Sequence, residues 1–270
     1  MGKQKARAYH AQTRLSVFDL QAELGMTKHM GGQQATEELV ELCYIDETTS
    51  VLDVGCGVGL TARYLAEEIG CEVVGMDISS RMIVRAEEYA SKAGVSDHVH
   101  FRTGDIQDLP FEDDRFDVVI VESVVSLLDE KQKAIRECVR VARPGGYVGF
   151  NESVWIKLPP QEYLEGLSDK AGVHVGVTTP EVWKQMLSDA GLKDVAARTY
   201  EPDVRSELRN TIRRIGFGDL LRVWGRAFRL YRQDPAYRDF VQEALSEPKE
   251  MLEYMGRGMF VGKKSRPLAI

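Results

Sequence analysis

The sequence predicts an α/β fold, a doubly wound and mostly parallel seven-stranded sheet with helices on both faces. Apolar segments of strand length alternate with helical patterns along the chain, which is the signature of such a sheet. The segment Ser50–Val54 runs into a loop with glycine at every second position, Gly55, Gly57 and Gly59. The next apolar segment ends in an acid, Asp77. Together these observations place a ligand-binding edge on a parallel sheet.

Strands and helices are expected in strict alternation over the middle of the chain. The expected strands are residues 50–54, 72–77, 98–103, 116–121, 146–151, 194–200 and 258–264. Helices are expected where apolar residues recur at helical spacing and glycine or proline follows. These segments are 33–44, 61–70, 81–93, 130–142 and 179–191.

Two segments do not fit this alternation of strands and helices and are interpreted as insertions. Residues 153–178 follow the fifth strand, and residues 202–257 separate the sixth strand from the last. Both leave from carboxyl ends of strands, where ligands bind in open α/β sheets, so we expect them to form a helical lid. The expected organisation is N-terminal cover helices at 1–45, a core at 46–201, a lid at 202–257, and a final strand and tail at 258–270.

The second insertion contains a strongly amphipathic helix, expected over Asp219–Gln233. Its apolar residues cover one broad side, and four arginines line the other, Arg222, Arg226, Arg229 and Arg232. One interpretation is a lid helix with a solvated arginine face. The other is a docking surface for a substrate phosphate or carboxylate, or for a membrane leaflet. The aromatic residues Trp155, Trp183, Trp224, Phe217 and Phe228 are candidates for apolar pocket walls.

Bulk composition narrows the class of protein. The 270-residue chain has a net charge of −7, which disfavours a nucleic-acid backbone as main partner. Its four cysteines are scattered without a C-x-x-C pair, so neither a zinc site nor a disulfide framework is expected. No apolar run approaches the about 18 residues of a spanning helix, and no signal-peptide pattern opens the chain. We expect a cytoplasmic protein without a metal.

The glycine loop indicates which kind of cofactor is bound. Glycines let a ligand lie against bare main chain, and Asp77 is placed to accept both hydroxyls of a ribose. A dinucleotide site needs a third glycine where Leu60 stands, so a nicotinamide dehydrogenase is disfavoured. Asp53 precedes the loop and would repel a pyrophosphate but suit a cation. S-adenosylmethionine (SAM) carries a sulfonium and an ammonium group and no phosphate.

This loop and four further segments together resemble the sequence motifs of the class I SAM-dependent methyltransferases. The segments are Gly75–Met82, Gly104–Ile106, Phe116–Glu122 and Arg143–Val148, in the family's order. The resemblance covers roughly residues 30 to 200 and is closest to small-molecule methyltransferases of the type found in ubiquinone and menaquinone biosynthesis. It implies a Rossmann-like sheet with an antiparallel last strand, SAM as cofactor and S-adenosylhomocysteine as product.

The resemblance also implies a set of cofactor-binding residues. Asp53 and the loop Gly55, Cys56, Gly57 and Gly59 would flank the methionyl end, Asp77 the ribose, and Gly104 and Asp105 the adenine amino group. Ile78, Met82 and Ile106 would sandwich the adenine ring, and Gly31 would close over the methionine. Alternatives remain open, because Asp105 could cap a turn, Met82 could be a core residue, and Cys56 fits the loop by its small size.

Three residues are candidates for a general base. Glu122 ends the fourth strand, Glu152 follows the fifth, and His29 precedes the first expected helix of the core. Either glutamate could take a proton or orient a cationic amine, or could be a cap or a salt-bridge partner. His29 could be a base or a surface residue. If the acceptor ionises on its own, alignment alone is enough.

We therefore expect a methyltransferase acting on a small molecule at N, O or C. Ile120–Ser123 replaces the motif that the family uses for exocyclic or amide nitrogens, so methylation of DNA adenine or of glutamine amides is disfavoured. The cysteine set of arsenite methyltransferases is also missing. Alternatives are a methyltransferase of a prenylated quinol or lipid at a membrane surface, which charge balance in the insertion disfavours, and a catalytically silent SAM-binding partner. A monomer or a homodimer is expected.

Overall fold

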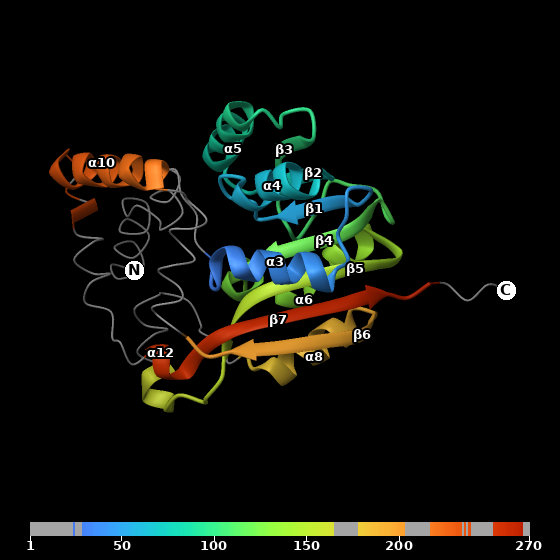
Figure 1. The fold of residues 1–270 in the computed structure, drawn as a ribbon. Helices are drawn as coiled ribbons and strands as arrows, with labels where there is room; N and C mark the ends of the chain where they lie inside the picture. The colour runs from blue at the N-terminus through green and yellow to red at the C-terminus, as the bar shows by residue number, and fades with distance from the viewer. Residues whose placement is uncertain are drawn as a thin grey trace, which may run out of the picture.

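A seven-stranded sheet organises the residues that the computed structural model describes, which are 24, 29–164, 178–202, 217–233, 235, 237–238 and 251–266. The strand order is β3-β2-β1-β4-β5-β7-β6 (Figure 1). The strands are β1 (Ser50–Val54), β2 (Glu72–Asp77), β3 (Val99–Thr103), β4 (Phe116–Glu122), β5 (Ala142–Trp155), β6 (Leu192–Tyr200) and β7 (Met255–Lys264). Strands β1 to β5 pair in parallel, and β7 is antiparallel to both β5 and β6. The predicted fold class is confirmed.

Helices cover both faces of the sheet. The elements are α3 (Gly32–Leu42), α4 (Leu60–Tyr64), the π-helix η1 (Leu65–Ile69), α5 (Ser80–Ala93), the 3-10 turn η2 (Val125–Leu127), α6 (Lys131–Val141), α8 (Pro180–Asp189), α10 (Phe217–Gln233) and α12 (Met251–Tyr254). Thr179 caps α8 by accepting from the Val182 backbone N–H, with Pro180 in the first turn as the sequence predicts. The expected helix 61–70 is divided, because a π-helix follows α4 and ends at Gly70, whose N–H donates to the Leu65 carbonyl.

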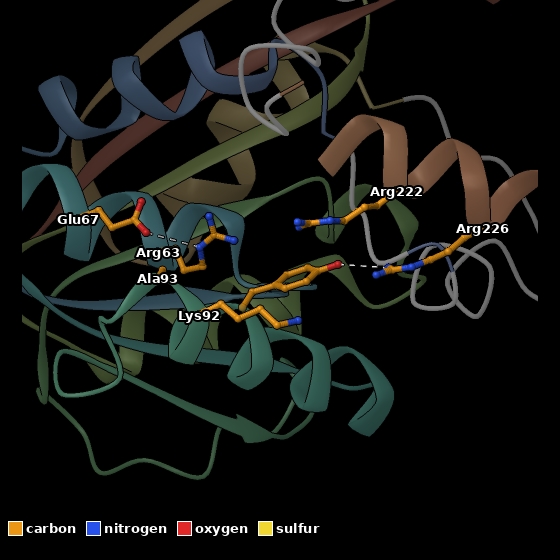
Figure 2. Close-up of a pocket in the computed structure, with 7 residues that line it drawn as sticks. Arg63, Glu67, Lys92, Ala93, Arg222 and Arg226 are labelled. Atoms are coloured by element: carbon orange, nitrogen blue, oxygen red, sulfur yellow. Dashed lines mark hydrogen bonds and ion pairs between the residues drawn. The ribbon is translucent and has the colours of Figure 1, made fainter. Parts of the chain in front are cut away.

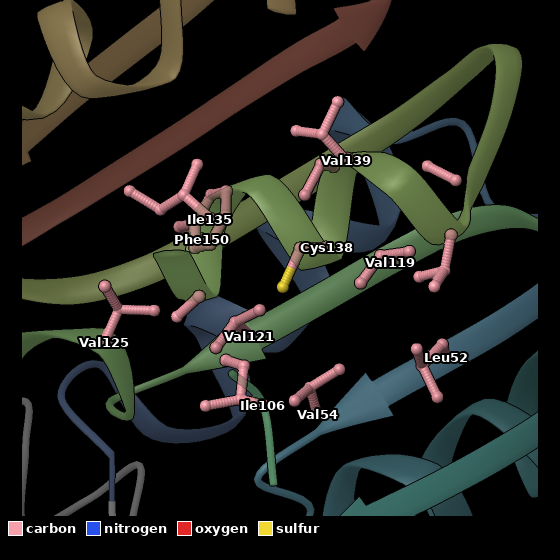
Figure 3. Close-up of a cluster of buried hydrophobic side chains, with 14 of the residues drawn as sticks. Leu52, Val54, Ile106, Val119, Val121, Val125, Ile135, Cys138, Val139 and Phe150 are labelled. Carbon is pink, nitrogen blue, oxygen red and sulfur yellow. The ribbon is translucent and has the colours of Figure 1, made fainter. Parts of the chain in front are cut away.

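The alternation of side chains along the strands creates two separate cores. On β1, Leu52 and Val54 join a cluster with α6 and α8, whereas Val51 joins a cluster with α3, α4 and α5. Figure 3 shows the first cluster, in which Cys138 of α6 points toward the valines of β4. Because successive residues point to opposite faces of a strand, one short apolar segment supplies both cores.

Strand β5 is longer than the sequence predicts. It continues beyond residue 151 because Ser153, Val154 and Trp155 pair with β7, which itself begins at Met255. The first insertion therefore begins at Ile156, and the second ends before Met255. Of the predicted N-terminal cover helices at 1–45, α3 lies in the described residues, whereas most of residues 1–28 and parts of both insertions lie outside them.

The described part of the second insertion lies on the side toward which β1 and β4 run (Figure 1). The strand order reverses between β1 and β4, and this is the point at which open α/β sheets bind ligands. The fold thus places α10 on the same side of the molecule as the carboxyl ends of β1 and β4. In the described ranges, no helix is long and apolar enough to cross a membrane.

Candidate functional site

The glycine loop after β1 is bound tightly to the end of β2. The backbone N–H groups of Gly55 and Cys56 donate to the Met76 carbonyl at 2.7 and 3.0 Å. Gly55 has φ of +75°, and a Cβ there would lie 2.1 Å from a methyl carbon of Val124. Only glycine fits this position, because both the backbone conformation and the space forbid a side chain.

Asp77 completes the attachment of this loop. Its Oδ2 accepts from the Gly57 N–H and its Oδ1 from the Ser79 N–H, both at 2.9 Å. Burial raises the pKa of Asp77, against the opposing effect of these two bonds. A loop amide that could hold a phosphate is therefore occupied by a carboxylate. A pyrophosphate would meet this negative charge, whereas a phosphate-free cationic cofactor fits it.

A second carboxylate lies beside the same loop. Asp53 is only 2% exposed. Burial raises the pKa of the Cys56 thiol well above its usual value, and the charges of Asp53 and Asp77 raise it further. Cys56 thus lies within electrostatic reach of both acids and stays a neutral thiol, which supports a packing role in the loop.

The residues predicted to bind adenine are near each other but differ in exposure. Ile78 is 74% exposed, whereas Met82 is 2% and Ile106 is 7% exposed. A large exposed isoleucine directly after Asp77 offers an apolar surface beside that carboxylate. Met82 packs with Val58 in a small buried cluster, so its contacts support the core interpretation.

Asp105 lies on the turn that follows β3. The Gly104 N–H donates to the Asp77 carbonyl at 3.0 Å, which fixes this turn next to Asp77. One carboxylate oxygen of Asp105 accepts from the Gln107 N–H at 2.8 Å. The side chain caps its own turn with one oxygen, and its other oxygen could accept a hydrogen bond from a ligand amino group.

A buried polar cluster surrounds the end of β4 and is centred on Glu122, which is 8% exposed. Thr61 of α4 donates to its carboxylate at 2.8 Å, and Thr36 of α3 donates at 3.2 Å. The Asn151 amide of β5 donates at 3.2 Å, and His29 Nε2 lies 3.2 Å from Oε2. One carboxylate thus joins α3, α4, β4 and β5.

His29 is a buried member of this cluster and not a surface residue, since it is 6% exposed. Its Nε2 faces Glu122, and its Nδ1 lies 3.1 Å from the Asn151 amide nitrogen. A carboxylate requires a donor and an amide nitrogen requires an acceptor. The contacts with Glu122 and Asn151 fit a neutral ring protonated on Nε2, whereas the Met30 carbonyl, 3.2 Å from Nδ1, fits a proton on Nδ1.

Sequence reasoning missed three members of the cluster, Thr36, Thr61 and Asn151. Asn151 pairs directly with Glu122 in the β4–β5 register, so a neighbouring-strand argument could have found it. The threonines lie on helices, and the sequence alone does not show whether a helical threonine points to solvent or to a buried polar group. Ser123, directly after Glu122, has φ of +60°, a backbone strain of the kind found at functional sites.

Glu152 lies apart from this cluster. It is fully buried, and its carboxylate accepts from the backbone N–H groups of Val124, Val125 and Ser126 at 2.8 to 3.1 Å. Burial raises its pKa despite these bonds. These contacts support the cap alternative, because the carboxylate satisfies the turn that follows β4.

Gly31 lies against β7 and the loop of His29. It has φ of +81°, and a Cβ there would meet the Arg257 side chain at 2.9 Å. Arg257 is 6% exposed and stacks over the Tyr200 ring at 3.8 Å. Gly31 therefore lets the loop pass close to a buried cation. Among the described residues, no group of three or more His, Cys, Asp or Glu side chains is arranged for a metal.

The aromatic residues considered as pocket walls do not form one surface. Trp155 and Trp183 belong to the core, and Trp183 stacks on Phe260 with 5.3 Å between ring centroids. Trp224 and Phe228 are 67% and 65% exposed on α10. Trp155 and Trp183 are thus core residues, whereas Trp224 and Phe228 lie at the surface of α10. The side chain of Phe217 lies outside the described residues.

Comparisons with known proteins agree with this geometry. Residues 52–150 match the family model described as a methyltransferase domain. An uncharacterised protein of Haemophilus influenzae is 31% identical over 177 residues, which cover 64% of this chain and 70% of that protein. The arsenite methyltransferase of Halobacterium salinarum is 35% identical over 148 residues, covering 54% of this chain and 38% of that enzyme.

The fold has a solved counterpart. Phosphoethanolamine N-methyltransferase 2 of Haemonchus contortus, in complex with S-adenosyl-L-methionine, superposes with a TM-score of 0.72 and 19% sequence identity, over 96% of this chain and 60% of that chain. The likeness shows that the sheet and its helices have a methyltransferase arrangement. The chain belongs to the class I SAM-dependent methyltransferases, enzymes whose cofactor is SAM.

Proposed function

We propose that the protein transfers the methyl group of SAM to a small-molecule acceptor and that the Glu122–His29 pair receives the acceptor's proton. The supporting observation is the 3.2 Å contact between His29 Nε2 and the Glu122 carboxylate. This contact lies at the end of β4, beside the strand that carries the glycine loop. A carboxylate and an imidazole would then lie beside the place where a cationic donor and a nucleophile meet.

The cofactor would lie across the ends of β1 and β2. Asp77 would accept the ribose hydroxyls, and Ile78 with Ile106 would border the adenine, next to Gly104 and Asp105. When bound, SAM supplies a methyl group activated by its positively charged sulfur. Asp53 and Glu122 add negative charge near the expected methionyl end, which favours a cation there.

His29 is arranged to receive a proton. The acceptor's lone pair would form the bond to the methyl carbon while the carbon–sulfur bond breaks, its electron pair staying on the sulfur of the departing S-adenosylhomocysteine. With the ring protonated on Nε2, the acceptor's O–H or N–H proton would pass to Nδ1 of His29. The acceptor would take the place of the Asn151 amide on this nitrogen. Glu122, hydrogen-bonded to Nε2, would stabilise the imidazolium that results.

The first prediction concerns Asp77 and the pH dependence of cofactor binding. Ribose hydroxyls donate to the ionised carboxylate, so SAM affinity is present above the folded-state pKa of Asp77 and falls as pH drops through it. Because burial raises that pKa, the loss should begin at a higher pH than for an ordinary aspartate. Asp77→Asn should weaken binding by about tenfold or more and remove this titration.

Isothermal titration with SAM between pH 4 and 7 measures both effects. Asp97→Asn is the matched control, because Asp97 is an exposed aspartate before the amino end of β3. Identical pH profiles for wild type and Asp77→Asn would contradict the placement of the ribose.

The second prediction separates the three candidate bases. His29→Ala should lower methyl incorporation by about a hundredfold or more, as expected for loss of a general base, and added imidazole should restore part of it. Glu122→Gln should lower the rate similarly, because the imidazolium loses its partner. Glu152→Gln should instead lower thermal stability by about 1–3 kcal/mol, since its amide would face backbone donors.

The assay supplies radiolabelled SAM with fractionated cell metabolites, which also identifies the acceptor. Melting temperatures of all variants separate folding from chemistry. If Glu152→Gln is stable but inactive, or if His29→Ala keeps the wild-type rate, the assignment of roles fails. Uniform absence of methyl transfer by the wild type to every fraction would favour the silent SAM-binding alternative.

The acceptor class is narrowed by the cysteines and by α10. All four cysteines are buried, and burial raises the pKa of each, so no thiolate set for arsenic exists despite the similarity to an arsenite methyltransferase. A lipid-like acceptor is the second candidate. Three aromatic residues of α10, Trp224, Phe228 and Tyr231, are 41% to 67% exposed along one helix face, which suits contact with an apolar surface.

The third prediction tests this second candidate. Wild type should float with liposomes of mixed neutral and anionic lipids if α10 contacts bilayers, and the double variant Trp224→Ser/Phe228→Ser should not. Tyr44→Ser, a change at an aromatic residue 72% exposed near the start of β1, is the control. Equal flotation of the double variant and wild type, or none by either, would leave a water-soluble acceptor as the only candidate.

A further inference from the structure

A basic cavity of about 480 Å³ lies between α10 and the core helices, away from the proposed active site. Figure 2 shows its lining, with Arg222 and Arg226 reaching from α10 toward Arg63 and Lys92. The remaining lining residues are Glu67, Tyr89 and Ala93. Residues of α4, η1 and α5 thus share one cavity with residues of α10.

The cations of this cavity gather around one ring. Arg63 and Lys92 lie 5.8 and 5.7 Å from the centre of the Tyr89 ring, and Arg226 donates to the Tyr89 hydroxyl at 3.4 Å. Cation–π contacts at this range are weakly attractive. They do not cancel the repulsion among positive groups that share a small volume.

The charge of the lining contrasts with that of the chain. Four cations face one carboxylate, Glu67, which lies 3.8 Å from Arg63 Nε. The whole protein carries a net charge of −7. A positively charged cavity on an acidic protein attracts anions more strongly than the rest of its surface does.

This cavity is separate from the Glu122 cluster. Thr61 and Arg63 are two residues apart on α4, so their side chains leave the helix about 200° apart. Thr61 is 4% exposed and donates to Glu122, whereas Arg63 faces the cavity. The two sites therefore lie on opposite sides of α4, and a ligand in the cavity would bind independently of the proposed methyl transfer.

We propose that the cavity binds the phosphate group of a small organic phosphate and that this ligand fastens α10 to the core. Arginine forks bind phosphate oxygens in pairs, and lysine binds them as a point charge. Pockets for small organic ligands have volumes of about 300–1,000 Å³, so the cavity has room for more than a bare ion. The Tyr89 ring and Ala93 offer apolar contact to the organic part.

The ligand would add a bridge between α10 and the core helices. Arg226 already donates to the Leu24 carbonyl and to Tyr89. A dianion placed between Arg222 and Arg226 on one side, and Arg63 and Lys92 on the other, would attract both sides. Anion binding should therefore order α10 against α5.

Titration calorimetry with glycerol 3-phosphate and with inorganic phosphate, in a buffer without other polyvalent anions, tests the proposal. We expect saturable binding of glycerol 3-phosphate, tighter than that of inorganic phosphate, and slower amide hydrogen exchange in α10 when it is bound. Arg222→Gln/Arg226→Gln should weaken binding by about tenfold or more. The control Arg229→Gln/Arg232→Gln removes the same charge from the same helix outside the cavity and should bind as wild type does.

Several outcomes would overturn the proposal. Equal weakening in both double variants would mean diffuse electrostatic attraction and no site. Equal affinity for the two anions would refute the organic ligand, and absence of saturable binding of either would refute the site. Because a variant could fail by unfolding, each must keep the wild-type melting temperature in the absence of phosphate, and Lys92→Gln on the stable helix α5 provides an independent second test.

Discussion

The hydrogen bond from the Gly57 N–H to the Asp77 carboxylate is the interaction on which the cofactor site depends. With the two bonds to the Met76 carbonyl, it holds the loop after β1 against the end of β2. The same carboxylate accepts from the N–H of Ser79, the residue whose side chain caps α5. A single aspartate therefore holds both the loop and the start of α5 and presents its charge at the sheet edge. This explains why a carboxylate is found where a dinucleotide fold keeps unoccupied amides.

The Glu122 cluster performs the corresponding task at the next strand. A buried carboxylate is tolerated only when donors surround it, and here the donors come from α3, α4, β5 and the loop of His29. Because the network is shared, a displacement of the N-terminal segment would disturb the glycine-loop helix as well. Glu122 thereby links the loop of His29 to the helix that follows the glycine loop.

Much of this could be predicted from the sequence, for identifiable reasons. Strands such as β1 and β4 are short, apolar and bounded by glycine or acid, so periodicity located them. The extension of β5 to Trp155 could not be predicted, because it depends on pairing with a strand about a hundred residues later. The same limit hid the roles of Thr36 and Thr61. The different surroundings of Glu122, at the end of β4, and Glu152, inside the extended β5, follow from the path of the chain around each strand, which composition does not encode.

The central claim is that the cofactor lies across β1 and β2, with its ribose on Asp77. The most direct measurement is a crystal structure of the protein with S-adenosylhomocysteine. The account predicts ribose hydroxyls within hydrogen-bond distance of the Asp77 carboxylate, the adenine ring against Ile78, and the sulfur directed toward Glu122. Density for the nucleoside at any other place, or an Asp77 carboxylate that makes no contact with it, would contradict the account.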